Sequence, residues 1–416
     1  MSSLPEHDEF STHSVPTDAR VASFRVAAVA SMVSFSLPTF ITGIEVSSGV
    51  GPDFMLAAIL GGALVIFLIG WLMGSIGART GFNSYLLVRL AFGDAGARVV
   101  NLAFSISLLG WFGVNLNLFG LAIAGLSDEL FGIIPPDLLV TIMASLLITV
   151  TTIIGFRVIN LVSTLMIPVL AFVAVALLVT ATSQAAPAVA ASQGEMSLGD
   201  GISAIVGSIV IGSIIMPDIT RFLSTSGGAL LTSGTSYMIA QPFVMWVAAS
   251  AAMVLGTEDI ISIMLTLGLG VGAFIIIIAG SWVLNALNLY SAVLGVTASF
   301  PSVSARTVTV VFGVIGVTAG LMNILDSFAT FLFYLSVVFI PVAGVIIVDH
   351  FIARPQAYRV TEVEDNQPLN RWGLLAWFMG AAVALAASEG FIGSLTRVVA
   401  LDAMLTTAVL YGVATR

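Results

Sequence analysis

The sequence contains no cysteine and only three histidines among its 416 residues. Without thiols there can be no disulfide and no thiolate metal site. His7, His13 and His350 lie outside the centres of the long apolar segments, which leaves little material for metal-assisted or histidine-based catalysis. A phosphate-binding P-loop is also missing, which argues against a nucleotide-driven pump. We therefore predict a protein that is not an enzyme, holds no metal or cofactor, and binds no nucleic acid.

Charge is also scarce, because 8% of the residues are charged and 58% are hydrophobic. A soluble domain carries about 25% charged residues, and the mean hydropathy here is +1.12. An α-helix needs about 18 apolar residues or more to cross a bilayer core of about 30 Å. Such runs recur from about Val26 to the C-terminus, and we count about twelve. The predicted fold class is an all-α polytopic membrane protein with about 12 transmembrane helices, surrounded by the lipid bilayer.

The positions of the charges predict how the chain is oriented. All 13 basic residues are arginine, and they alternate between the two sides of the apolar runs. By the positive-inside rule, the following arginines face the cytoplasm: Arg20, Arg25, Arg79, Arg89, Arg98, Arg157, Arg221, Arg306, Arg354, Arg359, Arg371 and Arg416. Arg397 is the exception. Both termini are then cytoplasmic, which requires an even number of spans, in a multi-pass protein of the plasma (cytoplasmic) membrane. Residues 1–24 are polar without a signal-peptide core, so we expect a cytoplasmic tail.

The longest connection predicts where two repeats are joined. It runs from Thr182 to Gly201 and follows the fifth apolar run. Inverted five-helix repeats place a substrate near the membrane midplane, beside interrupted helices. We predict a ten-helix core at 25–352, with repeats at about 25–181 and 202–352. A cytoplasmic loop and two peripheral helices would follow at 353–416.

Two apolar runs contain residues that disfavour a continuous helix. The first run contains "SLPTFITGIEVSSG" (Ser36–Gly49), and the sixth contains "IVGSIVIGSIIMPD" (Ile205–Asp218). Pro217 lacks a backbone donor, and Gly207 and Gly212 weaken the helix around the serines. Unpaired backbone at membrane depth is tolerated only where it is buried in protein or lines a wet cavity. The corresponding positions in the two halves favour a binding site, although close helix packing would also use glycine and proline.

Four stretches carry a family resemblance. They are "GARTGFNSYLLVRLAFG" from Gly77, "GWFGVNLNLF" from Gly110, "VGSIVIGSIIMPDITRF" from Val206 and "IPVAGVIIVDHF" from Ile340. Together they resemble the nucleobase:cation symporter family, and the bacterial cytosine permeases in particular. The resemblance implies a LeuT-type fold, with two inverted five-helix repeats plus two peripheral helices and alternating access to a central site. It also implies import of a flat heterocycle, such as cytosine or a purine, together with a cation.

The resemblance places Trp111 on the family's stacking tryptophan and Ser208 on a polar substrate contact. Trp111 lies 13 residues beyond Arg98, which corresponds to roughly 20 Å of helix and a position near mid-bilayer. Tryptophans that anchor a protein lie instead in the interfacial belts. Packing within the bundle is the alternative, because indole also fills cores. Asn115 follows one turn later on the same helical face and is a further site candidate.

Departures from the family pattern concern the substrate. Leu108 stands where cytosine permeases have a glutamine, Ile209 stands in place of a stacking phenylalanine, and Ile211 replaces a serine. An unpaired buried polar atom costs about 1 to 3 kcal/mol. The sequence therefore favours a more apolar or differently substituted heterocycle than cytosine. Hydantoin, allantoin or a vitamin precursor are the alternatives.

The segment "GSWVLNALNLYSA" from Gly280 offers Asn285 and Asn288 as polar contacts. Asparagines at this depth can equally form interhelical hydrogen bonds. The family's sodium site uses hydroxyl side chains in this segment, but this chain has Val283 and Leu284, which provide no oxygen ligand.

Three positions remain as candidate backbone ligands for a coupling ion, namely Phe35, Pro38 and Gly280. An ionisable residue within a span suggests an ion or proton path. Glu45 therefore makes H+ the favoured coupling ion over Na+, unless the break leaves this carboxylate hydrated near the outer surface. Asp218 and Arg221, at a spacing of three, predict an ion pair at the inner end of a helix.

The leading hypothesis is a secondary active importer of a nucleobase-like heterocycle that needs no obligate protein partner. A membrane channel is the alternative from another class. It would require a pore lined by repeated polar rings, and the sequence shows no such repeat.

Overall fold

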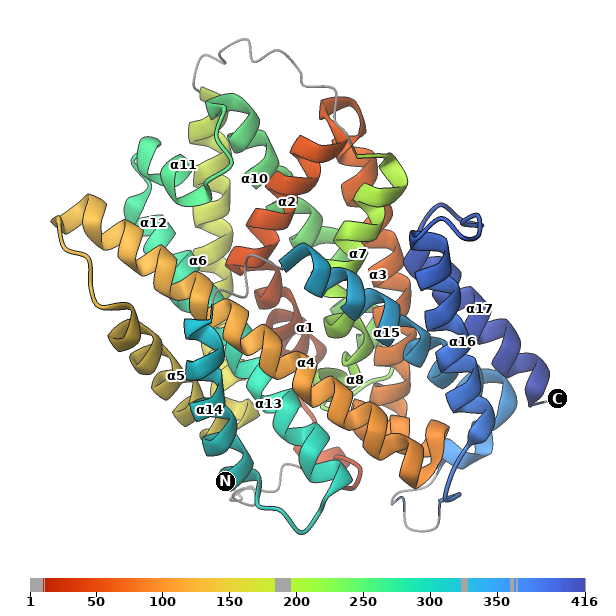
Figure 1. Ribbon diagram of the computed structural model, residues 1–416. Helices are drawn as coiled ribbons and strands as arrows, with labels where there is room; N and C mark the ends of the chain where they lie inside the picture. The colour runs from red at the N-terminus through yellow and green to blue at the C-terminus, as the bar shows by residue number, and fades with distance from the viewer. Residues whose placement is uncertain are drawn as a thin grey trace.

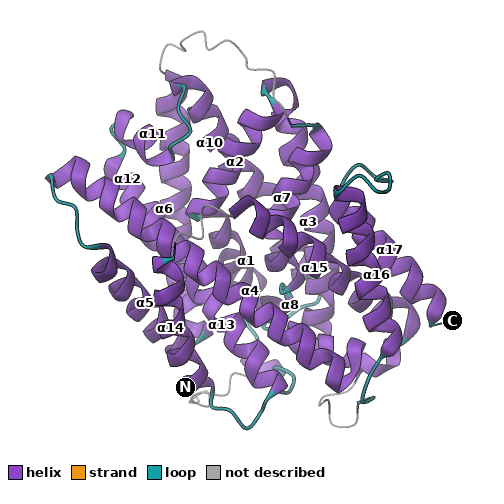
Figure 2. Cartoon of the chain, viewed as in Figure 1, coloured by secondary structure: helices purple, strands orange, loops and turns teal. Residues whose placement is uncertain are grey.

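A computed structural model of the chain describes residue 10 and residues 12–183, 196–322, 328–359, 363 and 366–415. The described part is a bundle of helices joined by short loops (Figures 1 and 2). The first nine residues of the predicted tail and most of the predicted repeat junction lie outside the described residues.

The elements of the first half are η1 (Thr17–Ala19), α1 (Ser23–Met32), η2 (Val33–Phe35), α2 (Leu37–Val50), α3 (Pro52–Thr80), α4 (Ser84–Phe131), α5 (Asp137–Ile154) and α6 (Phe156–Ser183). Those of the next part are α7 (Leu198–Ile214), α8 (Pro217–Thr220), α9 (Gly228–Ser233), η3 (Gly234–Ala240), α10 (Gln241–Leu255), α11 (Ile260–Thr266), α12 (Gly270–Ile275), η4 (Ile276–Gly280) and α13 (Ser281–Ser299). The chain ends with α14 (Ala305–Leu321), α15 (Phe328–Val348), η6 (Asp349–Ala353), η7 (Pro355–Arg359), α16 (Arg371–Ser388) and α17 (Val399–Ala414).

Within the described residues, 9 helical spans are long and apolar enough to cross a membrane, and the count is 10 when the bent pair α1–η2 and α2 is one span. The two shorter apolar helices are α14 and α17. They occupy the two remaining positions at which the sequence predicts a span. The helices therefore agree with the predicted all-α membrane fold and are consistent with its twelve spans.

The helices pack in a pattern that two inverted repeats would produce. The bent first span packs on the seventh through α2 and α10, and the second packs on the sixth through α3 and α7. In two inverted repeats, span one corresponds to span six and span two corresponds to span seven. The contact between spans one and seven then corresponds to the contact between spans six and two. Spans three and eight, α4 and α13, correspond to each other in the same way, and they also pack on each other. The peripheral helices α16 and α17 pack against α15 at the edge of the bundle (Figure 1).

A buried carboxylate attaches these peripheral helices to the core. Asp349 is fully buried and is bound by the Arg354 guanidinium, through two nitrogens that each lie 2.8 Å from a carboxylate oxygen. The hydroxyls of Tyr358 and Tyr411 also donate to it, at 2.8 and 2.6 Å. Tyr411 belongs to α17, so this network joins the end of span ten to the last helix.

The predicted break in span one is confirmed. The axis bends by 54° between Ser23–Phe35 and Leu37–Val50. Ser36, at the bend, has extended backbone angles (φ −87°, ψ 155°), and Pro38 lies in the first turn of α2. Proline is well tolerated in a first helical turn because the amides there have no intrahelical acceptor.

The break in span six falls within the stretch Ile205–Asp218 that the sequence singled out, and it lies at Pro217 rather than at the glycines. Gly207 and Gly212 lie inside the continuous helix α7. The helix stops at Ile214 and resumes at Pro217. Proline removes a donor from the ladder and clashes with the preceding turn, whereas isolated glycines only lower helix stability.

Candidate functional site

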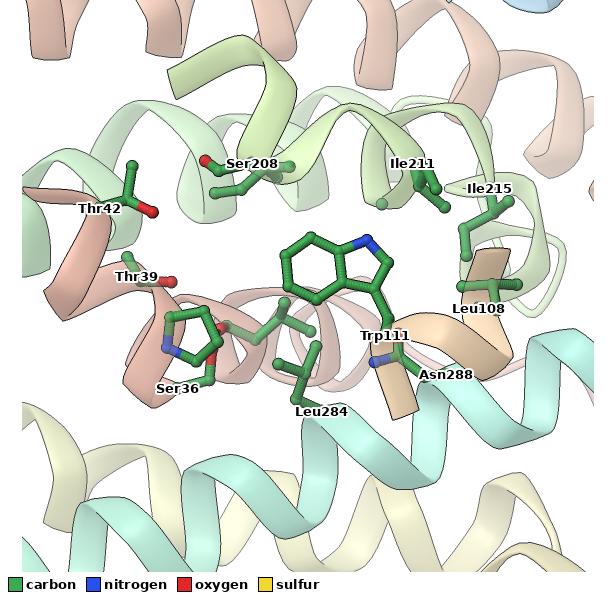
Figure 3. Close-up of a pocket in the computed structure, with 14 residues that line it drawn as sticks. Ser36, Thr39, Thr42, Leu108, Trp111, Ser208, Ile211, Ile215, Leu284 and Asn288 are labelled. Carbon is green, nitrogen blue, oxygen red and sulfur yellow. The ribbon is translucent and has the colours of Figure 1, made fainter. Parts of the chain in front are cut away.

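A cavity lies at the centre of the bundle, where the broken span one faces α4, α7 and α13 (Figure 3). Its empty space is about 530 Å³, a volume that includes the solvent at its open mouth. Span one contributes Val33, Ser36, Pro38, Thr39 and Thr42; α4 contributes Leu108 and Trp111; α7 and the residue that follows it contribute Ser208, Ile209, Ile211, Gly212 and Ile215; α13 contributes Leu284 and Asn288. All of these lining residues are uncharged.

Helical periodicity explains why these residues converge. Leu108 and Trp111 are three residues apart and so share one face of α4. The same spacing of three or four relates the lining residues of α7 to one another, and it relates Leu284 to Asn288 on α13. The indole ring of Trp111 extends into the middle of the cavity (Figure 3), and the residue is only 7% exposed. A planar ligand could therefore stack on this ring.

Polar atoms reach the cavity from three segments. The Ser36 hydroxyl donates to the Val33 carbonyl at 2.7 Å, and the Ser208 hydroxyl donates to the Ile205 carbonyl at 2.9 Å. Both oxygens keep lone pairs that can accept from a ligand. Asn288 is only 8% exposed. Its Nδ2 group is buried and has no hydrogen-bond partner among the described residues. This amide is a donor that a ligand could satisfy.

The structure brings together some of the predicted substrate residues and separates others. Trp111, Ser208, Leu108 and Ile209 line the cavity, as does Pro38 from the predicted ion set. Asn115 and Asn285 do not. Asn115 donates its amide to the Trp111 carbonyl at 2.8 Å, within its own helix.

Asn285 lines a separate, smaller space beside Trp282 and Phe119. One residue along a helix turns the side chain by about 100°. Leu284 and Asn288 face the cavity, and Asn285 therefore points away from it.

Sequence reasoning did not select Thr39 and Thr42, which both line the cavity. A signal was present, because two hydroxyl residues spaced by three follow Pro38 in the broken span. Hydroxyl residues are common in membrane helices, and this spacing alone does not show which face is turned toward the site.

The residues predicted to hold an ion lie at the break in span one. Gly280, the last residue of η4, packs directly on the Phe35 carbonyl, and a Cβ at this position would collide with that oxygen. Val283 is buried at 2% exposure, and Leu284 lines the cavity. The α13 side of this contact therefore presents aliphatic groups at the two positions where hydroxyl ligands would be needed.

Glu45 lies outside the cavity. It is an exposed residue of α2, one turn beyond Thr42 toward the C-terminal end of that helix. Its neighbours Ile44 and Val46 are buried, so Glu45 projects from one exposed face of α2.

Asp218 and Arg221 form the centre of a polar network one turn beyond the cavity. Ile215 and Asn288 line the cavity. Asp218 follows Ile215 by three residues across the break in span six, and Ser291 follows Asn288 by three residues on α13. Asp218 accepts from the Ser291 hydroxyl at 2.6 Å and from the Ser84 backbone amide at 2.8 Å. The network therefore closes the cavity on this side.

The prediction of an ion pair between Asp218 and Arg221 at the inner end of a helix did not indicate how deeply the two residues are buried. Both residues are fully buried, at 0% exposure. Arg221 donates to the Tyr290 hydroxyl and to the Phe10 carbonyl, each at 2.7 Å. Chain segments distant in sequence cover the pair, and the local spacing of three could not reveal them.

The segment before α1 crosses the same side of the bundle. The Val15 amide donates to the Gly81 carbonyl at 2.9 Å, and the Val21 amide donates to the Phe222 carbonyl at 2.7 Å. Arg20 binds the Ala78 carbonyl at 3.1 Å. The N-terminal segment therefore joins the ends of spans two and six below the polar network.

Comparison with known proteins places these features in context. A sequence profile described as permease for cytosine/purines, uracil, thiamine, allantoin matches residues 15–413. The cytosine permease of Escherichia coli (strain K12) is 27% identical over 385 residues, which cover 91% of this chain and 89% of that protein.

Two solved structures of Mhp1 are similar in fold. One is the nucleobase-cation-symport-1 family transporter in a closed conformation with bromovinylhydantoin bound, at a TM-score of 0.81 and 18% identity over 97% of this chain and 94% of that chain. The other is the inward-facing conformation, at a TM-score of 0.78 and 18% identity over 100% and 95% of the two chains. The fold is therefore the LeuT-type bundle that the sequence resemblance implied.

Proposed function

The chain belongs to the family of permeases for cytosine and purines, uracil, thiamine and allantoin, and from this we propose that it imports a nucleobase-like planar heterocycle. It is thus a multi-pass membrane transporter. The proposed substrate site is the central cavity, with Trp111 as the stacking surface. The proposed orientation has both termini in the cytoplasm and the Asp218 network on the cytoplasmic side of the plasma membrane.

The single observation that supports this function most strongly is the position of Trp111. Its ring extends into a cavity at the bend of a broken span, where the described lining residues are aliphatic or carry small neutral polar groups (Figure 3). Stacking on an aromatic face is worth about 1 to 3 kcal/mol per base. Ser208, Thr39 and Asn288 would hydrogen bond to the edge of the stacked ring.

For the coupling ion we propose a proton rather than sodium. Val283 and Leu284 support this choice, because they provide no oxygen where a hydroxyl-based sodium site would need two. The carbonyls of Phe35 and Pro38, with Gly280 opposite, are the remaining candidate ion ligands. Glu45, in its exposed position on α2, is the proposed titratable group of span one. Its role in binding the coupling proton is tested by substitution.

The experiment is uptake into proteoliposomes that contain the purified full-length chain. Radiolabelled cytosine, uracil, adenine, hydantoin and allantoin would be supplied with an inward proton gradient. We expect accumulation of at least one of them, competition by unlabelled analogues and loss of uptake in the Trp111→Ala variant. A panel that is neither transported nor bound would refute the proposed substrate class.

A further inference from the structure

The cavity wall has two chemically different sides. Thr39, Thr42 and Ser208 lie on one side of the Trp111 ring, and Leu108, Ile211 and Ile215 lie on the other (Figure 3). A ring stacked on the indole would thus present one edge to hydroxyl groups and the opposite edge to aliphatic groups.

The hydroxyl side of the cavity and Asn288 determine which polar atoms of a ligand can be bound. A threonine or serine hydroxyl can donate or accept, so these residues tolerate either kind of ring atom. Asn288 Nδ2 can only donate, and it is buried without a partner among the described residues. Leaving such a donor unsatisfied is costly. A ring carbonyl or another acceptor placed toward Asn288 removes that cost.

The aliphatic side of the cavity determines which substituent the ligand can carry on its opposite edge. An amino or oxo substituent placed beside Leu108, Ile211 and Ile215 would give up its hydrogen bonds with water, and none of these side chains can replace them. An alkyl substituent there would instead gain from burial. Each buried methylene improves affinity about fourfold.

The residues of the cavity wall also disfavour a charged ligand. None of the residues that line the cavity is ionisable, and an isolated charge is strongly disfavoured in a poorly hydrated site. A carboxylated ligand would find no basic side chain in the cavity, and a permanently cationic ligand would find no carboxylate.

We infer that the substrate is a neutral heterocycle with a ring carbonyl toward Asn288 and an alkyl substituent toward Leu108, Ile211 and Ile215. This inference rests on the proposed function and narrows its substrate class. It means that an unsubstituted nucleobase binds this chain more weakly than its alkyl derivative does.

The test uses matched ligands and thermal-shift titration of the purified full-length chain. Uracil is compared with 5-ethyluracil, and hydantoin with 5-isobutylhydantoin. Two further ligands serve as controls: 5-hydroxymethyluracil adds a polar group, and 5-carboxyuracil adds a charge. We expect each alkyl compound to bind at least about tenfold more tightly than its parent, with no binding of the carboxylate. Parents that bind as tightly as their alkyl derivatives, or tighter, overturn the inference while the proposed function stands. A panel without any binding overturns both.

A variant then locates the effect. Ile211→Thr keeps the branch at Cβ but replaces the ethyl arm with a hydroxyl, so the alkyl preference should fall about fivefold or more. Ile315→Thr makes the same change on α14, at a residue that is 43% exposed and outside the cavity, and it should leave the preference unchanged. If a folded Ile211→Thr protein keeps the full preference for alkyl ligands, the alkyl group lies against another part of the cavity wall. That result overturns the placement of the alkyl group beside Ile211. If that variant does not fold, the wild-type ligand series alone decides whether the alkyl preference exists.

Discussion

At the residue scale, function depends on which side chains face the cavity. Trp111 and Asn288 both line it, and one is an aromatic surface while the other is an unsatisfied donor. Neither is an ionisable group, so recognition must use stacking and neutral hydrogen bonds. Such sites discriminate by shape and by the pattern of donors and acceptors.

Replacing Trp111 tests the stacking surface. We expect Trp111→Ala to weaken heterocycle binding on the order of 10- to 100-fold, because stacking contributes about 1 to 3 kcal/mol. Trp111→Phe should recover part of this loss, since a smaller aromatic face remains. Binding is measured by titration and folding by thermal unfolding. Trp246→Ala is the matched control, since this tryptophan of α10 is 37% exposed and lies outside the cavity. A Trp111→Phe protein that binds no better than Trp111→Ala would contradict a stacking role.

Asn285 and Asn288 provide a pair of variants on one helix. Asn288→Ala should weaken binding about three- to tenfold, because a neutral hydrogen bond contributes about 0.5 to 1.5 kcal/mol. Asn285→Ala should leave affinity unchanged, because Asn285 lines a different space. Equilibrium binding to both purified variants makes the comparison. The reverse ranking would show that α13 is rotated relative to the described arrangement during binding.

At the element scale, the ends of several helices meet below the cavity. The Asp218 carboxylate links α8 to the start of α4 through Ser84 and to α13 through Ser291. These elements must separate if substrate leaves on that side. The bonds are therefore positioned to stabilise closure there.

The absence of cysteine permits a direct test of this closure. Ile215→Cys places a single thiol in the cavity wall, and the rate of its labelling by a membrane-impermeant reagent reports access. We expect Ser291→Ala to increase labelling from the side of the N-terminal segment severalfold, because one of the bonds to Asp218 is lost. Ser203→Ala is the control, since its hydroxyl bonds only to Gly199 within α7. Equal labelling in both backgrounds would exclude a contribution of the Ser291 bond to closure.

At the scale of the whole molecule, a LeuT-type fold couples the two faces of the membrane through one central site. Alternating access requires that the bent spans and their packed partners move relative to the rest of the bundle. The coupling ion determines whether that motion leads to accumulation. Its identity is a property of the transport cycle and is tested with the intact protein in a membrane.

We expect uptake to follow an imposed inward proton gradient and to persist when choline replaces sodium. Glu45→Gln should abolish gradient-driven accumulation but preserve substrate exchange, because only the titratable group is removed. Glu389→Gln, a change of another exposed carboxylate, is the control. Uptake that requires sodium and ignores the Glu45 substitution would instead assign coupling to sodium, held by the carbonyls at the span-one break.

The sequence determined the features that depend on local composition. Apolar runs specify the membrane fold, because each span must satisfy its own backbone hydrogen bonds and present apolar side chains to lipid. The break at Ser36 follows from Pro38 and the hydroxyl residues near it. The family resemblance selected Trp111, and its distance of 13 residues from Arg98 supported a mid-bilayer position without knowledge of the neighbouring helices.

Only the tertiary structure decided how each helix is rotated and what covers it. One residue of helix separates Leu284 from Asn285, and only the first lines the cavity. Asp218 is buried because Ser84 and Ser291, each more than 70 positions away in sequence, reach it from other spans. Glu45 is exposed on one face of α2, although its neighbours Ile44 and Val46 are buried. Hydropathy does not encode these outcomes, since they result from packing among spans of nearly equal apolarity, where small polar and glycine contacts set the rotation.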